Sequence, residues 1–214
     1  VMINRDNPNL IALGNGGKPE IAEEYKKLKS VIVRYSKKEG FKNTFVVTSS
    51  LGMEGKSLTA LNIAVSMAQE YDHTVLLVDA DIRKPTIGKY LGIEASLGIT
   101  DCLIDGADLG DAIIKTDIGR LSFLPAGKSV DNPVELLSSQ KMKNIITEIK
   151  TRYSNRYIII DTPPILPFAE TRTLCSLTDG VVFVVRERCA SENNITEALE
   201  LLSGSNILVV IYNA

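Results

Sequence analysis

Short runs rich in Val, Ile and Leu alternate with stretches of helical periodicity, and this alternation limits the fold of the chain more than any other feature. The runs do not switch between apolar and polar residues, so both faces of each expected strand should be covered. We therefore expect an α/β fold, a doubly wound and mostly parallel sheet with helices on both faces. The expected strands are 44–48, 74–79, 121–124, 157–161, 180–185 and 206–212, and the expected helices are 20–38, 56–70, 140–153, 170–175 and 191–202.

The length and composition of the chain indicate one globular domain. Its 214 residues are 44% hydrophobic and 23% charged, which argues against disorder. We expect a lead-in segment over 1–19 and a single domain over 20–214. The lead-in contains a glycine cluster at 14–17, but no strand-to-helix frame surrounds it, so we do not expect a nucleotide loop there.

Charge, cysteine content and hydropathy exclude several classes of protein. The net charge of −2 gives no electrostatic reason to expect a nucleic-acid partner. Cys102, Cys175 and Cys189 are widely spaced and form no metal-ligand pattern, which is typical of a reducing cytosol. The longest apolar runs are far shorter than the about 18 residues of a membrane-spanning helix. The start of the chain does not resemble a signal peptide.

The segment that joins the expected strand 44–48 to the expected helix 56–70 has the composition of a phosphate-binding loop. Such a loop needs a close-approaching glycine, a lysine for phosphate charge and a hydroxyl for magnesium. Gly55, Lys56 and Ser57 supply these at a helix N-terminus, which favours anions. Ser50 stands where the strict form G-x-x-x-x-G-K-S/T has its first glycine. The candidate nucleotide-binding residues are Ser50, Leu51, Gly52, Met53, Glu54, Gly55, Lys56, Ser57 and Leu58.

Three aspartates follow expected strands that should end at the same edge of the sheet. Asp79 and Asp81 follow the run 74–79, and Asp161 closes the run 157–161. Such an aspartate caps a helix or faces a ligand. Two prolines after Asp161 exclude a cap there, and the cap explanation is weak for Asp79. Because carboxylates would repel a polyphosphate, the pattern implies Mg²⁺ between them, with one carboxylate free to accept a proton from a nucleophile.

These motifs resemble those of the bacterial protein-tyrosine kinases that regulate capsular and exopolysaccharide synthesis. The family's Walker A, Walker A′ and Walker B motifs correspond to 49–57, 75–85 and 158–164. Glu23-x-x-Lys26-x-x-Lys29 is similar to the family's E-x-x-R-x-x-R helix, which packs subunits into a ring. The resemblance spans nearly the whole chain, is closest to autokinases of exopolysaccharide gene clusters, and implies a P-loop NTPase type of sheet.

The resemblance also implies an activity, which is ATP- and Mg²⁺-dependent transfer of a γ-phosphoryl group to protein tyrosine. In that interpretation Lys56 binds the β- and γ-phosphates and Ser57 binds Mg²⁺. Asp79 and Asp81 share magnesium binding and activation of the tyrosine hydroxyl, and Asp161 holds Mg²⁺ through water. Lys56, Asp79 and Asp81 are therefore the expected catalytic residues, and Ser57, Asp79 and Asp161 the expected metal ligands.

Further expectations concern adenine, partners and location. Asn213 matches an asparagine that contacts adenine in related ATPases. Arg83 and Lys84 match a basic pair that contacts substrate or stabilises a subunit interface, although a solvated surface pair explains them equally well. Glu23, Lys26 and Lys29 would form the oligomer interface. The family implies a transmembrane activator of the chain-length-determinant type, protein tyrosine substrates, no nucleic acid, and a cytoplasmic location at the inner membrane through a partner.

Two departures from the family pattern leave alternatives open. Lysines replace both arginines of the ring helix, and lysine cannot make the bidentate carboxylate contact of arginine. The family's tyrosine cluster is missing, since only Tyr212 lies near the end of the sequence. The main rival is a ParA/MinD-like positioning ATPase that acts as a nucleotide-dependent dimer switch. That class carries a signature lysine where this chain has Leu51. A regulatory nucleotide-binding protein without transfer activity is the third possibility.

Overall fold

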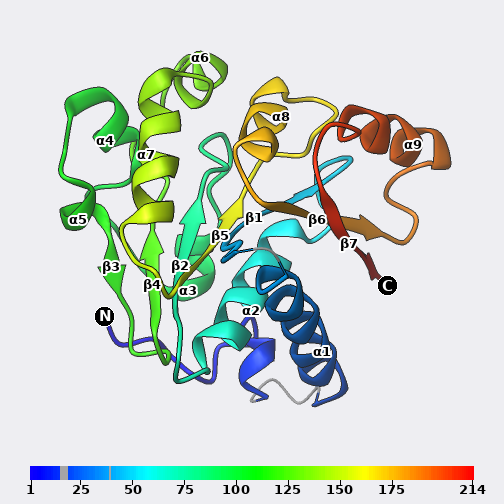
Figure 1. Cartoon of the computed structure of the whole chain (residues 1–214), viewed down its shortest axis with the longest axis horizontal. Coiled ribbons are helices and arrows are strands. Elements are labelled where there is room, and N and C mark those ends of the chain that lie inside the picture. The colour runs from blue at the N-terminus through cyan, green and yellow to red at the C-terminus, as the bar shows by residue number, and fades with distance from the viewer. Residues whose placement is uncertain (15–18, 39) are drawn as a thin grey trace.

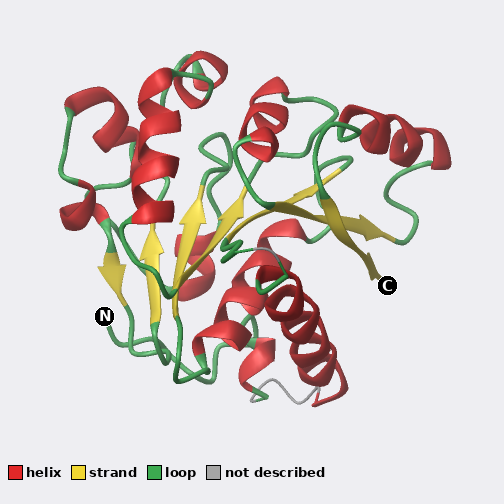
Figure 2. Ribbon diagram, in the orientation of Figure 1, coloured by secondary structure: helices red, strands yellow, loops and turns green. Residues whose placement is uncertain are grey.

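A twisted sheet between two layers of helices makes up the part of the chain that the computed structural model describes, which is residues 1–14, 19–38 and 40–214 (Figures 1 and 2). The strand order is β3-β4-β2-β5-β1-β6-β7, and all neighbouring pairs are parallel except β3 with β4. The strands are β1 (Thr44–Ser49), β2 (Thr74–Asp79), β3 (Ile114–Lys115), β4 (Leu121–Leu124), β5 (Arg156–Asp161), β6 (Gly180–Arg186) and β7 (Ile207–Asn213). The doubly wound, mostly parallel fold expected from the sequence is confirmed.

The helices cover both faces of the sheet, and each face has its own hydrophobic core. One face carries η1 (Ile11–Leu13), α1 (Pro19–Ser36), α2 (Lys56–Ala68) and α3 (Ile87–Leu91). The other carries α4 (Ile99–Asp105), α5 (Leu109–Ala112), α6 (Pro133–Leu137), α7 (Gln140–Thr151), α8 (Ala169–Ser176) and α9 (Glu192–Leu201).

The depth at which each element is buried explains whether its sequence is apolar throughout or apolar along one stripe. Every residue of β1 is buried, as expected for a central strand covered on both faces. Helix α2 packs between the sheet and α1, so nearly all of its residues are buried. Helix α7 covers the opposite face at the surface, and it buries only one stripe through Met142, Ile146 and Ile149.

The lead-in contributes to the core of the α1 and α2 face. Ile3, Leu10 and Ala12 are buried there. Asn62 of α2 holds this segment, because its Oδ1 accepts the Ala12 N–H at 2.9 Å and its Nδ2 donates to the Asn9 carbonyl at 2.8 Å. The division of the chain at 19/20 stays a prediction, and 15–17 of the glycine cluster lie outside the described residues.

The region between 80 and 120 differs most from the sequence-based expectation. It contains three short helices, α3, α4 and α5, and the antiparallel edge strand β3, where no regular element was expected. Each of these elements is only 2 to 7 residues long. Such pieces are too short for periodicity to reveal them, since tertiary packing decides their conformation.

The sheet register brings the functional segments to one edge. Asp79 at the end of β2 pairs directly with Asp161 at the end of β5. Val47 of β1 pairs with Asp161 from the other side, so the loop after β1 emerges next to that carboxylate. Among the described residues, no helix combines the length and the hydropathy that a bilayer crossing requires.

Candidate functional site: a phosphate loop and three aspartates

The loop after β1 turns sharply into α2 through Gly55. Gly55 has a φ of +88°, a backbone conformation that favours glycine, and a Cβ added there would displace the Asn213 side chain, whose Nδ2 would lie 2.5 Å away. No side chain caps α2. The first-turn amides therefore remain for an anion, as the sequence predicts for a phosphate loop.

A buried carboxylate supports this loop from inside. Glu54 is fully buried, and its Oε2 accepts the Ser50 hydroxyl at 2.9 Å and the Leu51 N–H at 2.7 Å. Its Oε1 accepts the N–H of Arg186, at the end of β6, at 3.3 Å. Ser50 thus replaces the first glycine of the strict motif with a donor for Glu54. Both residues were expected to bind nucleotide, but their side chains contact each other inside the loop.

Asn213 lies beside the loop at the end of β7. Its Nδ2 donates to the backbone carbonyl of Glu54 at 3.2 Å. The ends of β6 and β7 therefore both contact the loop, since Arg186 bonds to Glu54 and Met53, and Asn213 bonds to Glu54. The structure brings Asn213 to the nucleotide loop, as the sequence suggests, while its amide contacts protein backbone. Its contact with adenine stays a prediction.

Lys56 joins the loop to the aspartates. Its Nζ lies 2.7 Å from Oδ2 of Asp81 and 3.7 Å from Oδ1 of Asp161, and it donates to Ser57 Oγ at 3.1 Å. Burial lowers the pKa of Lys56, but Asp161 and Asp81 more than offset this, so its pKa lies above the ordinary value. The loop lysine, the loop serine and two of the three aspartates therefore meet at one point.

Asp79 has two roles that the sequence did not separate. Its Oδ2 accepts the N–H groups of Thr86 and Ile87, at 3.2 and 3.1 Å, and so holds the start of α3. The cap explanation that seemed weak from the sequence therefore applies to this oxygen, although the capped helix begins eight residues later. The other oxygen, Oδ1, is buried without a donor. Burial, and next the charge of Asp161, raise the pKa of Asp79 well above its ordinary range.

Asp161 is fully buried, and neither of its oxygens has a hydrogen-bond partner of ordinary geometry. Burial raises the pKa of Asp161 to about 6, even though Lys56 and Ser57 lower it. Uncompensated buried carboxylate oxygens are costly, and a hard divalent cation would compensate them. Among the described residues, no group of three or more Asp, Glu, His or Cys side chains is placed to hold a metal ion by itself. Mg²⁺ takes one or two carboxylates and completes its shell with water and phosphate.

A cavity of about 310 Å³ opens over the phosphate loop and Asp81, and the buried Asp79 and Asp161 are not among its lining residues. Its inner wall is the phosphate loop with Asp81. Its outer wall consists of polar, apolar and basic side chains from segments that follow β2 and β5, and of these only Arg83 and Lys84 were singled out from the sequence. These outer residues are Arg83, Lys84, Thr86, Tyr90, Pro164 and Phe168.

Arg83 is fixed on the outer wall from two sides. Its Nε donates to Oε1 of Glu170 at 2.6 Å, and its guanidinium lies 4.5 Å from the ring centre of Phe168. Glu170 is fully buried at the start of α8, and its Oε2 has no hydrogen-bond partner. An acid near a helix start is common as a cap, so the sequence alone carried no signal of this contact.

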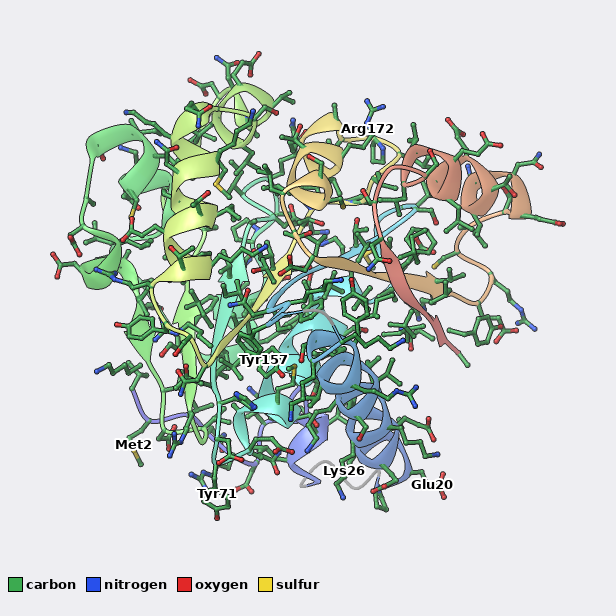
Figure 3. The ribbon with its side chains drawn as sticks, viewed as in Figure 1. Met2, Glu20, Lys26, Tyr71, Tyr157 and Arg172 are labelled. Carbon is green, nitrogen blue, oxygen red and sulfur yellow. The ribbon has the colours of Figure 1, made fainter. Side chains whose placement is uncertain are left out.

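The three residues of the expected oligomer interface lie on α1. Lys26 pairs with Glu23 along the helix at 3.0 Å, and both side chains are more than half exposed. Lys29 instead contacts Glu70, just beyond α2, at 2.6 Å. Two of the three side chains thus remain on the surface, and their role in assembly stays a prediction. Figure 3 shows Lys26 on the outer side of α1.

Comparison with known proteins identifies the relatives of this arrangement. The family model described as an AAA domain matches residues 42–204. The chain is 34% identical over 194 residues to tyrosine-protein kinase YwqD of Bacillus subtilis, covering 90% of this chain and 80% of that protein. It is 36% identical over 194 residues to tyrosine-protein kinase CpsD of Streptococcus agalactiae, covering 89% and 82%.

Solved structures agree with the sequence relatives. The chimerical protein CapA2B2 superposes with a TM-score of 0.87 at 29% identity, covering 99% of this chain and 92% of that one. The septum site-determining protein MinD of Pyrococcus horikoshii, complexed with Mg-ADP, superposes with a TM-score of 0.67 at 24% identity, covering 79% and 69%. The second likeness shows the fold alone.

Proposed function

Because this chain belongs to the family of bacterial tyrosine-protein kinases, we propose that it transfers the γ-phosphoryl group of ATP to protein tyrosine in the presence of Mg²⁺. The observation that carries this proposal is the meeting of Lys56 with Asp81 and Asp161 at the start of α2. The phosphate loop supplies the nucleotide site. Buried carboxylate oxygens that accept no hydrogen bond call for a cation to compensate their charge.

The residues divide between phosphate, metal and acceptor. The amides from Gly52 to Leu58 and the ammonium of Lys56 bind phosphate oxygens. Ser57, Asp79 and Asp161 hold Mg²⁺, which neutralises phosphate charge when it is bound. Asp81 accepts the proton of the tyrosine hydroxyl, and Asn213 contributes to the adenine side of the loop.

Lys56 and Asp81 also couple nucleotide binding to acceptor activation. Without phosphate, Lys56 neutralises Asp81 through the 2.7 Å contact. A phosphate competes with Asp81 for the same ammonium. Nucleotide binding and the Asp81 carboxylate are therefore coupled through one cation.

The proposed setting is the synthesis or export of capsule or exopolysaccharide. We propose that the chain functions at the inner membrane from the cytoplasmic side, bound to a transmembrane activator of the chain-length-determinant type. Copies of the chain assemble into a ring through Glu23, Lys26 and Lys29 of α1. Lys29 is already held by Glu70, so Glu23 and Lys26 are the exposed members of this interface.

The rival proposal is a nucleotide-dependent dimer switch, which shares the fold and the acidic motifs. Leu51 stands at the position of the signature lysine of that class, and its N–H is bonded to Glu54. A switch hydrolyses ATP without transferring phosphate to protein. Phosphotyrosine on an acceptor therefore separates the two proposals.

The test is transfer of γ-³²P from ATP with Mg²⁺ to tyrosine, either on the chain or on a copolymer of Glu and Tyr. Lys56→Met and Asp81→Asn are the variants, and Lys143→Ala is the matched control because Lys143 is exposed on α7, away from both the cavity and α1. We expect label on tyrosine with the native chain and the control only. ATP hydrolysis without any phosphotyrosine would favour the switch, and equal phosphotyrosine in both site variants would refute the residue assignments.

A further inference from the structure

The outer wall of the cavity is suited to a tyrosine with acidic neighbours. Pro164 and the half-buried Phe168 offer apolar surface for an aromatic ring. Arg83 and Lys84 place two cations beside it. Among the described residues no acceptor contacts either Nη group of Arg83, since only its Nε is bonded to Glu170. These Nη groups remain available to bind a carboxylate of the acceptor.

Most of the chain's seven tyrosines are unsuitable acceptors. Tyr157 is buried, with its hydroxyl 2.8 Å from Ser36 Oγ. Tyr35 donates to the carbonyl of Asp179, and Tyr90 lines the cavity itself. Tyr25 is largely buried, which raises the pKa of its hydroxyl.

Among the described residues, three tyrosines are well exposed, and they differ in how they are held. Tyr153 is 44% exposed in the loop between α7 and β5, and the Arg156 guanidinium covers its ring at 3.8 Å. Tyr212 is 65% exposed but belongs to β7, whose backbone pairs with β6. Tyr71 is 85% exposed in the turn between α2 and β2, where neither helix nor sheet holds the backbone. Among the tyrosines of the described residues, Tyr71 is therefore the one that can enter a cavity with the least rearrangement.

The neighbours of Tyr71 match the outer wall in charge. Glu70 precedes it and Asp72 follows it, so the acceptor presents a carboxylate on each side. Glu70 also pairs with Lys29, with 42% of its side chain exposed. Contacts between these carboxylates and the basic side chains of the outer wall are exposed to solvent. They add modest affinity but favour one orientation of the acceptor.

Tyr71 cannot reach the cavity of its own chain. Helix α2 begins at the phosphate loop with Lys56 and runs 13 residues away from it. At 1.5 Å per residue this is about 20 Å, and Tyr71 lies beyond its far end. Figure 3 shows Tyr71 at the margin of the molecule opposite Arg172 of α8, the helix that begins beside the outer wall.

We propose that Tyr71 of one copy of this chain is phosphorylated in the cavity of a second copy. This inference rests on the proposed function. The phenolic oxygen of Tyr71 forms a bond to the γ-phosphorus of ATP while the bond to the β,γ-bridging oxygen breaks, and ADP leaves. The phenolic proton passes to Asp81 of the second copy. The new phosphate then lies next to Glu70, where it competes with that carboxylate for Lys29.

The first experiment maps the phosphate on the native chain after incubation with ATP and Mg²⁺. We expect label in the peptide that contains residue 71, and its loss in Tyr71→Phe. The matched control is Tyr212→Phe, which removes the next most exposed tyrosine and should keep the label at 71. If the copolymer of Glu and Tyr is labelled but residue 71 is not, the inference is overturned while the kinase activity stands. If neither is labelled, the proposed function fails as well.

The second experiment tests transfer between copies. Active Tyr71→Phe enzyme is mixed with an inactive acceptor chain, Lys56→Met, and with the double variant Lys56→Met/Tyr71→Phe. We expect label on the first acceptor and none on the second, and equal labelling of both would overturn the proposal. Asp81→Asn serves as a second inactive acceptor, in case Lys56→Met does not fold.

The third experiment tests the acidic neighbours with peptides of residues 66–76 as acceptors. Replacing Glu70 and Asp72 by Gln and Asn should lower kcat/KM about two- to five-fold through each exposed charge contact. Arg83→Gln enzyme should lose this preference, so that its kcat/KM is the same for both peptides. Equal kcat/KM for both peptides with the native enzyme would refute the role of Arg83 and Lys84.

Discussion

Two aspartates at opposite edges of the sheet show how differently the fold treats a carboxylate. Asp179 precedes β6 at the amino edge, and its Oδ2 accepts the N–H groups of Asn43 and Thr44 at 3.0 and 3.1 Å. Its Oδ1 accepts Lys150 Nζ at 2.5 Å. Asp161 ends β5 at the carboxyl edge, and no donor of ordinary geometry reaches either oxygen.

The difference separates a structural acid from a functional one. The bonds of Asp179 come from backbone and from α7, so they form whenever the chain folds. The charge of Asp161 is compensated only in part by Lys56, at 3.7 Å. Burying the charge of Asp161 at the carboxyl edge therefore costs free energy, which a bound cation and nucleotide would recover. Such a cost is typical of functional sites.

The largest expected effect is on transfer in Asp161→Asn. The amide keeps the volume of the side chain but cannot hold Mg²⁺ as a carboxylate does. We expect phosphoryl transfer to fall about 10²- to 10³-fold, a typical loss for one charge-stabilising group. At pH 8 without ligands, the free energy of unfolding should rise by about 1–3 kcal/mol, because the neutral amide removes a buried charge. Radiolabel transfer and urea unfolding measure the two effects, and loss of both would contradict the comparison.

Asp179→Ala should give the opposite pattern. It leaves the N–H groups of Asn43 and Thr44 without an acceptor and Lys150 without its partner. We expect the free energy of unfolding to fall by about 2–4 kcal/mol. The affinity for ADP of the folded fraction should not change, because Asp179 lies at the other edge. Urea unfolding and calorimetric titration with ADP check this, and weaker ADP binding by fully folded protein would argue against two independent edges.

The pH dependence of stability should differ between the two edges. Burial raises the pKa of Asp161 to about 6 from an ordinary value of 3.8, so the folded state binds this proton more tightly than the unfolded state. Its contribution to stability is full below pH 4 and is lost as the pH rises through about 6, by at most about 3 kcal/mol. Asp79 acts in the same direction. Unfolding curves from pH 4 to 8 should show this decline in the native chain and a smaller one in Asp161→Asn, whereas parallel curves would contradict the raised pKa.

The carboxyl edge could be predicted from the sequence because its parts follow long apolar strands. Parallel strands of known polarity bring Lys56, Asp79 and Asp161 to one edge whatever the details of the loops. The chemistry of Gly-Lys-Ser and of aspartates after strands then follows from residue type alone. The comparisons with relatives confirm the family, and the seven-stranded sheet confirms the fold.

What could not be predicted depends on side chains that meet across long stretches of sequence. Asp79 holds the start of α3 only because the chain returns to it at Thr86 and Ile87. Glu170 reaches Arg83 across 87 residues. Short elements such as β3 have no periodicity of their own, since the sheet edge decides their pairing.

Glu54 lies at the carboxyl edge like Asp161, but its carboxylate accepts hydrogen bonds from three donors. Glu54→Gln tests whether the loop depends on this carboxylate. An amide nitrogen would face the N–H of Leu51, the hydroxyl of Ser50 or the N–H of Arg186, and one of these would lose its acceptor. We expect the affinity for ADP to weaken about tenfold, or about 1.4 kcal/mol. Ser50→Ala is the control, because it removes one donor and keeps the carboxylate, and its effect should be smaller. Unchanged affinity in Glu54→Gln would show that the loop holds its shape without this acid.

The smallest expected effect comes from Lys29→Ala. This variant tests whether the burial of an ion pair or the distance between its charged atoms decides its contribution to stability. The Lys29–Glu70 contact at 2.6 Å is as short as the Lys56–Asp81 contact at 2.7 Å, but its side chains are 20% and 42% exposed instead of 10% and 7%. Lys29 lowers the pKa of Glu70, yet water screens this pair. Its loss should change the free energy of unfolding by less than about 1 kcal/mol. Thermal unfolding beside Lys26→Ala measures this. A loss above about 2 kcal/mol would mean that contact length, and not burial, decides what an ion pair contributes in this fold.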